Sequence, residues 1–313
     1  MRILLVFLVY LLSSLSCFSQ YLSPREGFVN VEGGRISYKI IGSGKKTPLL
    51  IIHGGPGGRG DCSFIAPFTA ISNDRPIILY DQLGSGRSDK STDSTLWQLP
   101  RFVNEIDSLR AALGLKKLHI MGHSWGGTVL IEYLITKKPK GILSAIFASP
   151  LISTPIWMHD ANFLLSQLPK NLQDTIKKYE TLKEYNAPSY TAASDSFYAK
   201  HMSVKQCPVL PILECADLKG NREIYNYMWG SSEFNATGTL KSFDRSPSLR
   251  QLKLPVLFIA GEFDEARPET MYRFSKLVRK SKVVILDKAG HAIQIDQPEK
   301  FPKSVANFIN SVQ

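Results

Sequence analysis

Short, continuous runs of apolar residues recur along the chain, and stretches with apolar residues at helical spacing stand between them. A run without polar alternation is typical of a strand that is buried on both faces of a sheet. Residues 27–42 differ, because they form two strand-like segments around a Gly33-Gly34 turn and so predict a hairpin. We expect the other strands within residues 48–54, 75–81, 116–123, 141–150, 254–261 and 281–290.

Amphipathic patterns predict helices between these strands. Residues 101–115 and 125–139 carry apolar side chains at helical spacing, and residues 268–281 and 298–312 continue the pattern to the C-terminus. Strands that alternate with helices indicate a mostly parallel sheet with helices on both faces, which is an α/β fold.

Residues 151–242 interrupt this alternation. They are rich in Leu, Lys, Tyr and Asp at helical spacing and contain few β-rich runs. We interpret this range as a helical cap, inserted between a strand that ends near Ala148 and a strand that starts near Pro255. The predicted organisation is an α/β core made of residues 20–150 and 243–313, with residues 151–242 as the cap.

The first residues form a separate segment. Arg2 precedes an apolar run, and Cys17 and Ser19 are small residues at positions −3 and −1 of a cut before Gln20. We interpret residues 1–19 as a signal peptide, which predicts an exported protein, periplasmic or secreted or envelope-associated, without a stable membrane span after cleavage. The apolar run is shorter than the roughly 20 residues of a membrane span, but an uncleaved anchor and lipidation at Cys17 stay open.

Composition changes this picture little. Of 313 residues, 43% are hydrophobic and 21% are charged, as in an ordinary globular protein. The net charge is +11, but Lys and Arg are scattered and no nucleic-acid motif is present, so we expect no nucleic-acid partner. After the signal peptide, Cys62, Cys207 and Cys215 remain. A Cys207–Cys215 disulfide and free thiols are both open, and no cysteine spacing resembles a metal site.

Candidate chemistry begins at "MGHSWGG", in which Gly122, Ser124 and Gly126 form a G-x-S-x-G pattern. An apolar strand precedes the pattern and a helix follows it, which is the context of the nucleophile elbow of α/β-hydrolases. In such a turn, the glycines avoid steric clashes and the serine hydroxyl is exposed at a helix N-terminus. Ser124 is therefore the predicted nucleophile, and the alternative is a serine that only caps a helix.

A serine nucleophile needs a base, and the base needs a carboxylate that orients it. In this fold both follow the serine along the chain, first Asp or Glu and then His. Asp264 lies just beyond one predicted strand, and His291 lies in the loop after the last one. We therefore predict a triad of Ser124, Asp264 and His291. Asp81 also follows a strand but precedes the nucleophile, and we interpret it as structural.

An oxyanion needs backbone N–H donors that are in place before the charge develops. In this fold one donor belongs to the residue after the nucleophile, here Trp125, and the other to a loop after an earlier strand. That loop is "HGGPG", in which we predict Gly55 as the donor and Gly54 as the residue that shapes the turn. Glycines here would let a substrate oxygen reach the backbone, while Pro56 stiffens the segment. The alternative is a merely flexible loop.

The motifs "HGGPGG", "YDQLGSGRS", "GHSWGG", "GEFDE" and "AGH" together resemble the proline iminopeptidase (prolyl aminopeptidase) family of α/β-hydrolases, which includes the tricorn-interacting aminopeptidases. The resemblance covers about residues 25–312. It implies the α/β-hydrolase fold, the triad and oxyanion residues named above, and removal of an N-terminal residue, often proline, from a peptide. Two positions depart from the family pattern: Leu83 stands where many members carry Arg, and His123 where Gly or Ser is frequent.

The resemblance also implies two glutamates that hold the α-ammonium group of the substrate. Glu265 directly follows Asp264, and Glu233 lies in "MWGSSEF", with Tyr225 expected in the same pocket. A buried ammonium needs carboxylate partners, and two acceptors would fix how far a chain end can enter the site. The alternative is that both glutamates are solvated surface charges.

These residues predict a serine aminopeptidase that acts on short peptides with a free N-terminus and needs no metal or other cofactor. An esterase, lactonase or amidase with the same triad is the alternative activity, and a binding protein that has lost catalysis is the alternative from another class. The strictness of the preference for proline stays open, because the cap before about residue 220 offers no motif. The natural peptide and the oligomeric state also stay open.

Overall fold

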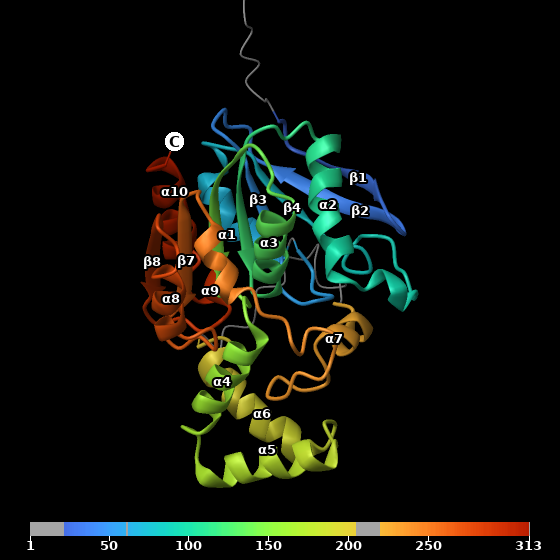
Figure 1. The fold of residues 1–313 in the computed structure, drawn as a ribbon, viewed down its shortest axis with the longest axis vertical. Coiled ribbons are helices and arrows are strands. Elements are labelled where there is room, and N and C mark those ends of the chain that lie inside the picture. Colours follow the sequence, from blue (N-terminus) through green and yellow to red (C-terminus); the bar gives the residue numbers. More distant parts are fainter. Residues whose placement is uncertain (1–21, 61, 205–219, 313) are drawn as a thin grey trace, which may run out of the picture.

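The computed structural model describes residues 22–60, 62–204 and 220–312. The predicted signal peptide, residues 1–19, lies outside these ranges, as do Cys207 and Cys215. Within them, eight strands form one sheet in the order β1-β2-β4-β3-β5-β6-β7-β8 (Figure 1). The strands span Arg25–Val31 (β1), Gly34–Ile41 (β2), Leu49–Ile52 (β3), Ile77–Tyr80 (β4), Leu118–His123 (β5), Ile142–Ala148 (β6), Val256–Gly261 (β7) and Ser281–Leu286 (β8).

Strand direction agrees with the prediction of a mostly parallel sheet. β1 and β2 form the predicted antiparallel hairpin, and β2 also pairs antiparallel with β4. Every other neighbouring pair is parallel. The predicted α/β fold is therefore confirmed, with an antiparallel hairpin at one edge of the parallel sheet.

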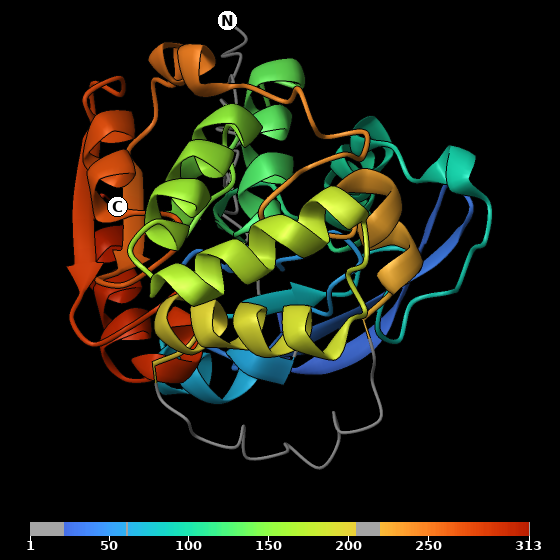
Figure 2. The ribbon, with the colours of Figure 1, turned by 90° about the horizontal axis from the view of Figure 1, so that it is seen from below.

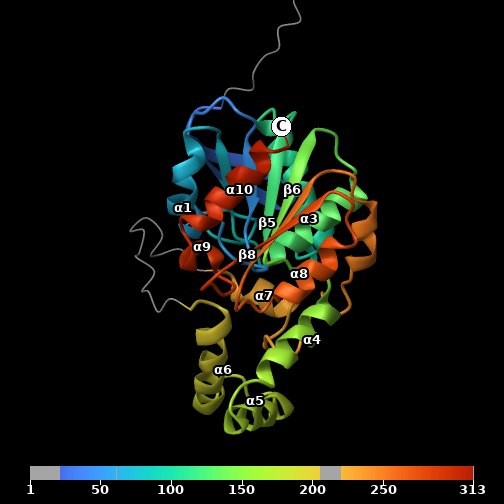
Figure 3. The ribbon, with the colours of Figure 1, turned by 90° about the vertical axis from the view of Figure 1, so that its left-hand side faces the viewer.

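The continuous apolar runs are explained by burial on both faces of the sheet, because successive side chains of a strand point to opposite sides. In β3, Leu50 and Ile52 belong to one hydrophobic cluster, and Leu49 and Ile51 belong to the other. Figure 3 shows helices on both sides of the strands. The first cluster includes residues of α2 (Leu99–Ala112), α3 (Trp125–Thr136) and α8 (Pro268–Ser275), and the second includes residues of α1 (Cys62–Ser72), α9 (Ile293–Asp296) and α10 (Lys300–Asn310).

The predicted helices within residues 101–115, 125–139, 268–281 and 298–312 correspond to α2, α3, α8 and α10. The helix α1 has no counterpart among the predictions. Pro67 lies inside it, and proline usually interrupts a helix because it lacks the N–H donor. Short 3-10 helices occur at Ser94–Leu96 (η1) and Ser246–Gln251 (η3).

Between β6 and β7 the chain forms further helices, in the range predicted as a cap. Figures 1 and 2 show α4, α5 and α6 outside the sheet, with α5 and α6 side by side. Ile176 of α5 and Phe197 of α6 belong to a small separate cluster, whereas Ile224 and Met228 of α7 join the main core. These helices span Thr154–Leu165 (α4), Lys170–Leu182 (α5), Pro188–His201 (α6) and Arg222–Met228 (α7).

No helix in the described ranges is both long enough and apolar enough to cross a membrane.

Candidate active site

Ser124 lies in the turn between β5 and α3. Its backbone has φ 54° and ψ −121°, a conformation that is rare for residues other than glycine. A Cβ on Gly122 would lie 2.2 Å from the carbonyl oxygen of Gly126, and a Cβ on Gly126 would lie 2.3 Å from that of Ile52. Backbone atoms therefore require glycine on both sides of Ser124, which is the local reason for the G-x-S-x-G pattern.

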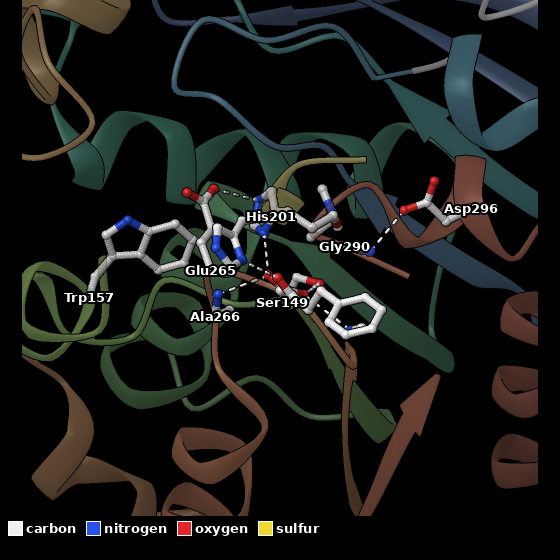
Figure 4. A network of polar contacts seen from close by, with 12 residues as sticks. Ser149, Trp157, His201, Glu265, Ala266, Gly290 and Asp296 are labelled. Atoms are coloured by element: carbon white, nitrogen blue, oxygen red, sulfur yellow. Dashed lines mark hydrogen bonds and ion pairs between the residues drawn. The ribbon is translucent and has the colours of Figure 1, made fainter. Parts of the chain in front are cut away.

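His291 and Asp264 form a buried pair. Nδ1 of His291 lies 2.8 Å from Oδ1 of Asp264, and both residues are at most 5% exposed. The carboxylate also accepts hydrogen bonds from the Ser149 hydroxyl (2.5 Å) and from the backbone N–H groups of Ala266 (2.8 Å) and Gly261 (3.2 Å). These donors hold the carboxylate in place, so that it can orient the imidazole (Figure 4).

The loop that carries His291 is held by the end of α6 and by a buried aspartate. The backbone N–H of His291 donates to the carbonyl oxygen of His201 over 2.7 Å, and that of Ala292 donates to Met202 over 2.7 Å. The carboxylate of Asp296 accepts from the N–H of Gly290 over 2.8 Å. Segments separated by about ninety residues along the chain thus fix the position of the imidazole (Figure 4).

Glu265 and Trp157 contact the same imidazole, and Glu233 and Tyr225 extend this cluster. Oε1 of Glu265 lies 3.8 Å from Nε2 of His291, and the Trp157 ring packs edge-on against the imidazole with a centroid separation of 5.4 Å. Glu233 accepts hydrogen bonds from the Trp157 indole (3.2 Å) and from the Tyr225 hydroxyl (2.5 Å). The structure therefore joins Glu233 and Tyr225 to the side of the site where Trp157 and Glu265 contact His291; Figure 4 shows Trp157 and Glu265.

The protonation of this cluster follows from its burial. Glu265 is 2% exposed, and burial, together with the charge of Glu233, raises the pKa of its carboxyl well above the ordinary value. Burial alone would lower the pKa of His291, but the charges of Asp264 and Glu265 outweigh it and raise the pKa above the ordinary value. The site thus stabilises positive charge.

The glycine-rich loop "HGGPG" packs against the serine turn. A Cβ on Gly54 would lie 3.3 Å from the Cβ of Ser124, so the loop passes directly beside the serine. Gly55 has φ +136°, and a Cβ there would lie 2.5 Å from the backbone nitrogen of Gly58. The turn itself therefore excludes a side chain at position 55, and the predicted access of a substrate oxygen to this backbone stays a prediction.

Asp81 connects this loop with the next one. Its carboxylate accepts from the backbone N–H of Gly60 over 2.7 Å and from that of Arg87 over 2.9 Å. Both contacts are to backbone groups of loops, which agrees with the interpretation of Asp81 as structural.

Comparisons with known proteins place this geometry in a family. The α/β hydrolase fold family matches residues 47–298 of the chain. A proline iminopeptidase of Heyndrickxia coagulans is 42% identical over 292 residues, which cover 92% of this chain and 99% of that protein. A proline iminopeptidase of Saccharolobus solfataricus is 30% identical, with 93% and 94% covered. The chain belongs to the proline iminopeptidase family of α/β-hydrolases.

Two crystal structures support the membership at the level of the fold. The proline iminopeptidase of Mycobacterium smegmatis superimposes with a TM-score of 0.80 at 27% identity, and covers 92% of this chain and 98% of its own. The structure of VinJ superimposes with a TM-score of 0.83 at 26% identity, and covers 93% of this chain and 100% of its own.

This proline iminopeptidase family member has site residues that the sequence did not reveal. Ser149 directly follows β6, so the strand-end rule that indicated Asp264 applies to it as well. Trp157 and His201 lie on helices between β6 and β7, where no such rule helps. Among the described residues, no group of three His, Cys, Asp or Glu side chains could hold a metal ion.

One departure from the family pattern has a structural explanation. His123 is buried, and its Nε2 lies 3.1 Å from the carbonyl oxygen of His291. Burial lowers the pKa of His123 to about 3, so the ring is neutral and can donate this hydrogen bond. A histidine before the nucleophile therefore supports the loop of the predicted base.

Gly55→Ala should reduce hydrolysis of a chromogenic proline anilide by at least about tenfold, because a strained backbone costs about 1–3 kcal/mol and the new Cβ displaces the loop beside Ser124. Steady-state rates and thermal unfolding measure the two effects. Gly114→Ala is the matched control, because Gly114 also has positive φ (+65°) but nothing lies within 4 Å of its Cβ position. The control should lose about 1 kcal/mol of stability and keep its activity. Full activity in Gly55→Ala would contradict the assignment of this loop.

Proposed function

We propose that this protein is a serine aminopeptidase that releases N-terminal proline from short peptides. The observation that carries the proposal is the pair of glutamates, Glu233 and Glu265, next to the His291–Asp264 pair. Oε2 of Glu265 is buried and has no hydrogen-bond partner in the described structure. A cationic ligand would supply the hydrogen-bond donor that this buried carboxylate oxygen lacks.

The position of Glu265 supports an exopeptidase. In any peptide, the nitrogen of a residue lies about 2.5 Å from its own carbonyl carbon. An ammonium bound at Glu265 is therefore close to the imidazole, which is 3.8 Å from that carboxylate. Only the nitrogen of the residue that supplies the scissile carbonyl can be bound there while the carbon of that carbonyl is attacked. That nitrogen is a cation only at a chain terminus.

The number of acceptors favours proline. The ammonium of an N-terminal proline is secondary and carries two N–H donors, which two carboxylates can satisfy. The relatives named above carry the name proline iminopeptidase. The indole N–H of Trp157 and the hydroxyl of Tyr225 donate to Glu233, and their aromatic rings supply apolar surface for the pyrrolidine ring.

In the proposed reaction, Nε2 of His291 takes the proton of the Ser124 hydroxyl as the oxygen attacks the carbonyl carbon. The N–H groups of Gly55 and Trp125 stabilise the oxyanion. His291 then gives its proton to the leaving amine, the C–N bond breaks, and a prolyl ester remains on Ser124. Water, deprotonated by His291, hydrolyses this ester to free proline and restores the serine. Asp264 keeps the imidazole oriented throughout.

Short peptides are the proposed substrates because the predicted cap, residues 151–242, contributes directly to the site. Trp157 comes from α4 and Tyr225 from α7, and both contact Glu233. A long or folded chain would have to displace these elements. Gly54, which packs beside Ser124, is proposed to contact the substrate from the opposite loop.

We also propose that residues 1–19 direct export, on the basis of the sequence pattern alone. Expression of the full chain in a bacterium, followed by fractionation and N-terminal sequencing, should give an exported protein that begins at Gln20. A protein that retains Met1 in the cytoplasmic fraction would contradict export.

A substrate panel tests the main proposal. The free-amine amides of proline, alanine and leucine with 7-amino-4-methylcoumarin are compared with acetyl-proline amide and with p-nitrophenyl acetate. Free proline amide should have the highest kcat/KM. Ser124→Ala should lose at least about a thousandfold in kcat and should not react with a fluorophosphonate probe. Preference for blocked amides or for esters would instead favour the endopeptidase or esterase alternative.

Glu265→Gln should raise KM for free proline amide about tenfold to a hundredfold, because a hydrogen bond to a charged group contributes about 1.5–3 kcal/mol. Rates with p-nitrophenyl acetate, compared on the pH plateau of each variant, should stay the same, since this ester has no ammonium. Glu262→Gln is the matched control, because Glu262 is exposed and only three positions away. Equal losses on both substrates would contradict the ammonium role.

The same variant should change the pH dependence of kcat/KM. Activity falls at low pH when His291 becomes protonated and can no longer accept the serine proton. Glu265 raises the pKa of His291, so its replacement by Gln should move the acid limb to lower pH. Rate profiles between about pH 6 and pH 11 extend to both sides of the wild-type His291 pKa of about 9, and a limb that stays in place or moves to higher pH would contradict the prediction.

A further inference from the structure

His53 directly follows β3 and is fully buried, yet the proposed reaction does not use it. Its Nε2 lies 3.1 Å from the backbone nitrogen of Gln82. A backbone N–H can only donate, so Nε2 must be the unprotonated nitrogen and Nδ1 must carry the proton. Nδ1 lies 2.6 Å from the carbonyl oxygen of Gly54 and therefore donates to it. Burial lowers the pKa of His53, which keeps the ring neutral in this tautomer.

The carbonyl group of Gly54 belongs to the same peptide unit as the N–H of Gly55. A peptide unit is planar, so a hydrogen bond that fixes the carbonyl oxygen also fixes the direction of the N–H on the other side. Hydrogen bonding at the oxygen further polarises the N–H as a donor. His53 therefore orients the backbone N–H of Gly55, which we assign as one of the two oxyanion donors.

Gln82 connects His53 with Trp125, the residue that carries the second proposed oxyanion donor. Oε1 of Gln82 accepts a hydrogen bond from the Trp125 indole over 2.9 Å, and both side chains are fully buried. The backbone N–H of Trp125 is the other proposed donor. Gln82 thus contacts His53 through its backbone and Trp125 through its side chain.

The segment of Gln82 is itself anchored. The N–H of the next residue, Leu83, donates to Oε1 of Glu105 over 3.0 Å, and the same oxygen pairs with Arg101 over 2.5 Å. Glu105 and Arg101 are buried on α2, so the core holds the Gln82 segment in place.

From these contacts we propose that His53 and Gln82 are positioning residues that align the two oxyanion donors, Gly55 and Trp125. The inference rests on the proposed serine-hydrolase function but not on the identity of the substrate. His53 is not a second base, because both of its ring nitrogens are engaged by backbone groups.

The experiment compares His53→Leu with His53→Asn. Leucine removes the donor to Gly54, whereas the amide nitrogen of asparagine can take the place of Nδ1. His119→Leu is the matched control, because His119 is equally buried but pairs with Ser144 within the sheet. For each variant, kcat is measured per serine labelled by a fluorophosphonate, together with KM, the melting temperature and inhibition by prolinal, whose hemiacetal with Ser124 places an oxygen in the oxyanion site.

His53→Leu should lower kcat per labelled serine about tenfold to a hundredfold with little change in KM, because misplacing a reacting group by about 1 Å costs up to a hundredfold. The inhibition constant of prolinal should rise by the same factor, while that of proline should not change. His53→Asn should recover most of the loss, and Gln82→Leu should also lower kcat. His119→Leu should retain kcat.

Two results would overturn the inference. The first is an unchanged kcat per labelled serine in His53→Leu, with or without a fall in melting temperature or labelled fraction. The second is an Asn variant no better than the Leu variant. If the wild type cleaves esters but not free proline amide, the proposed substrate fails. The His53, Gln82 and His119 variants are then compared with the ester as substrate, because every acyl transfer at Ser124 forms an oxyanion.

Discussion

The backbone conformation of Ser124 is the constraint on which the rest of the site depends. A non-glycine residue with positive φ costs about 1–3 kcal/mol and persists only where its surroundings fix it. Here the N–H of Ser124 donates to Ala148, and its carbonyl oxygen accepts from Gly127 and Leu151. Ala148 ends β6, the parallel neighbour of β5, Leu151 follows it, and Gly127 lies in the first turn of α3. The parallel sheet and the helix that follows β5 thus hold the turn together.

The same architecture concentrates charge where the core would otherwise be apolar. Asp264, Glu265 and His291 are all almost completely buried, and such groups destabilise a protein unless they are paired. Asp264 is fully paired, whereas Glu265 retains an oxygen without a partner in the described structure. Burial of Glu265 is therefore electrostatically unfavourable in the free protein, and a bound cation would offset this cost. Such an arrangement is expected of a binding site, whereas the groups of a structural ion pair satisfy each other.

The sequence predicted those parts of the site that depend on strand order and backbone sterics. Ser124, Asp264 and His291 follow strand ends, and glycines at 122 and 126 are dictated by nearby backbone atoms, so short-range patterns suffice for them. Trp157 could not be predicted, because its place beside His291 depends on how α4 packs on the core. The two glutamates were indicated by the family resemblance alone. No pattern in the local sequence predicts that Glu233, between β6 and β7, lies near His291, which follows β8.

The hydrogen bonds between the end of α6 and the His291 loop have a consequence for local stability. The carbonyl groups of residues 201 and 202 accept the N–H groups of His291 and Ala292, while α5 and α6 rest on a small cluster of their own. A small core opens at lower free energy than a large one. The His291 loop therefore takes part of its support from these outer helices, although it follows the last strand of the sheet. Heat or denaturant that loosened α5 and α6 would remove these two hydrogen bonds while the sheet stayed folded.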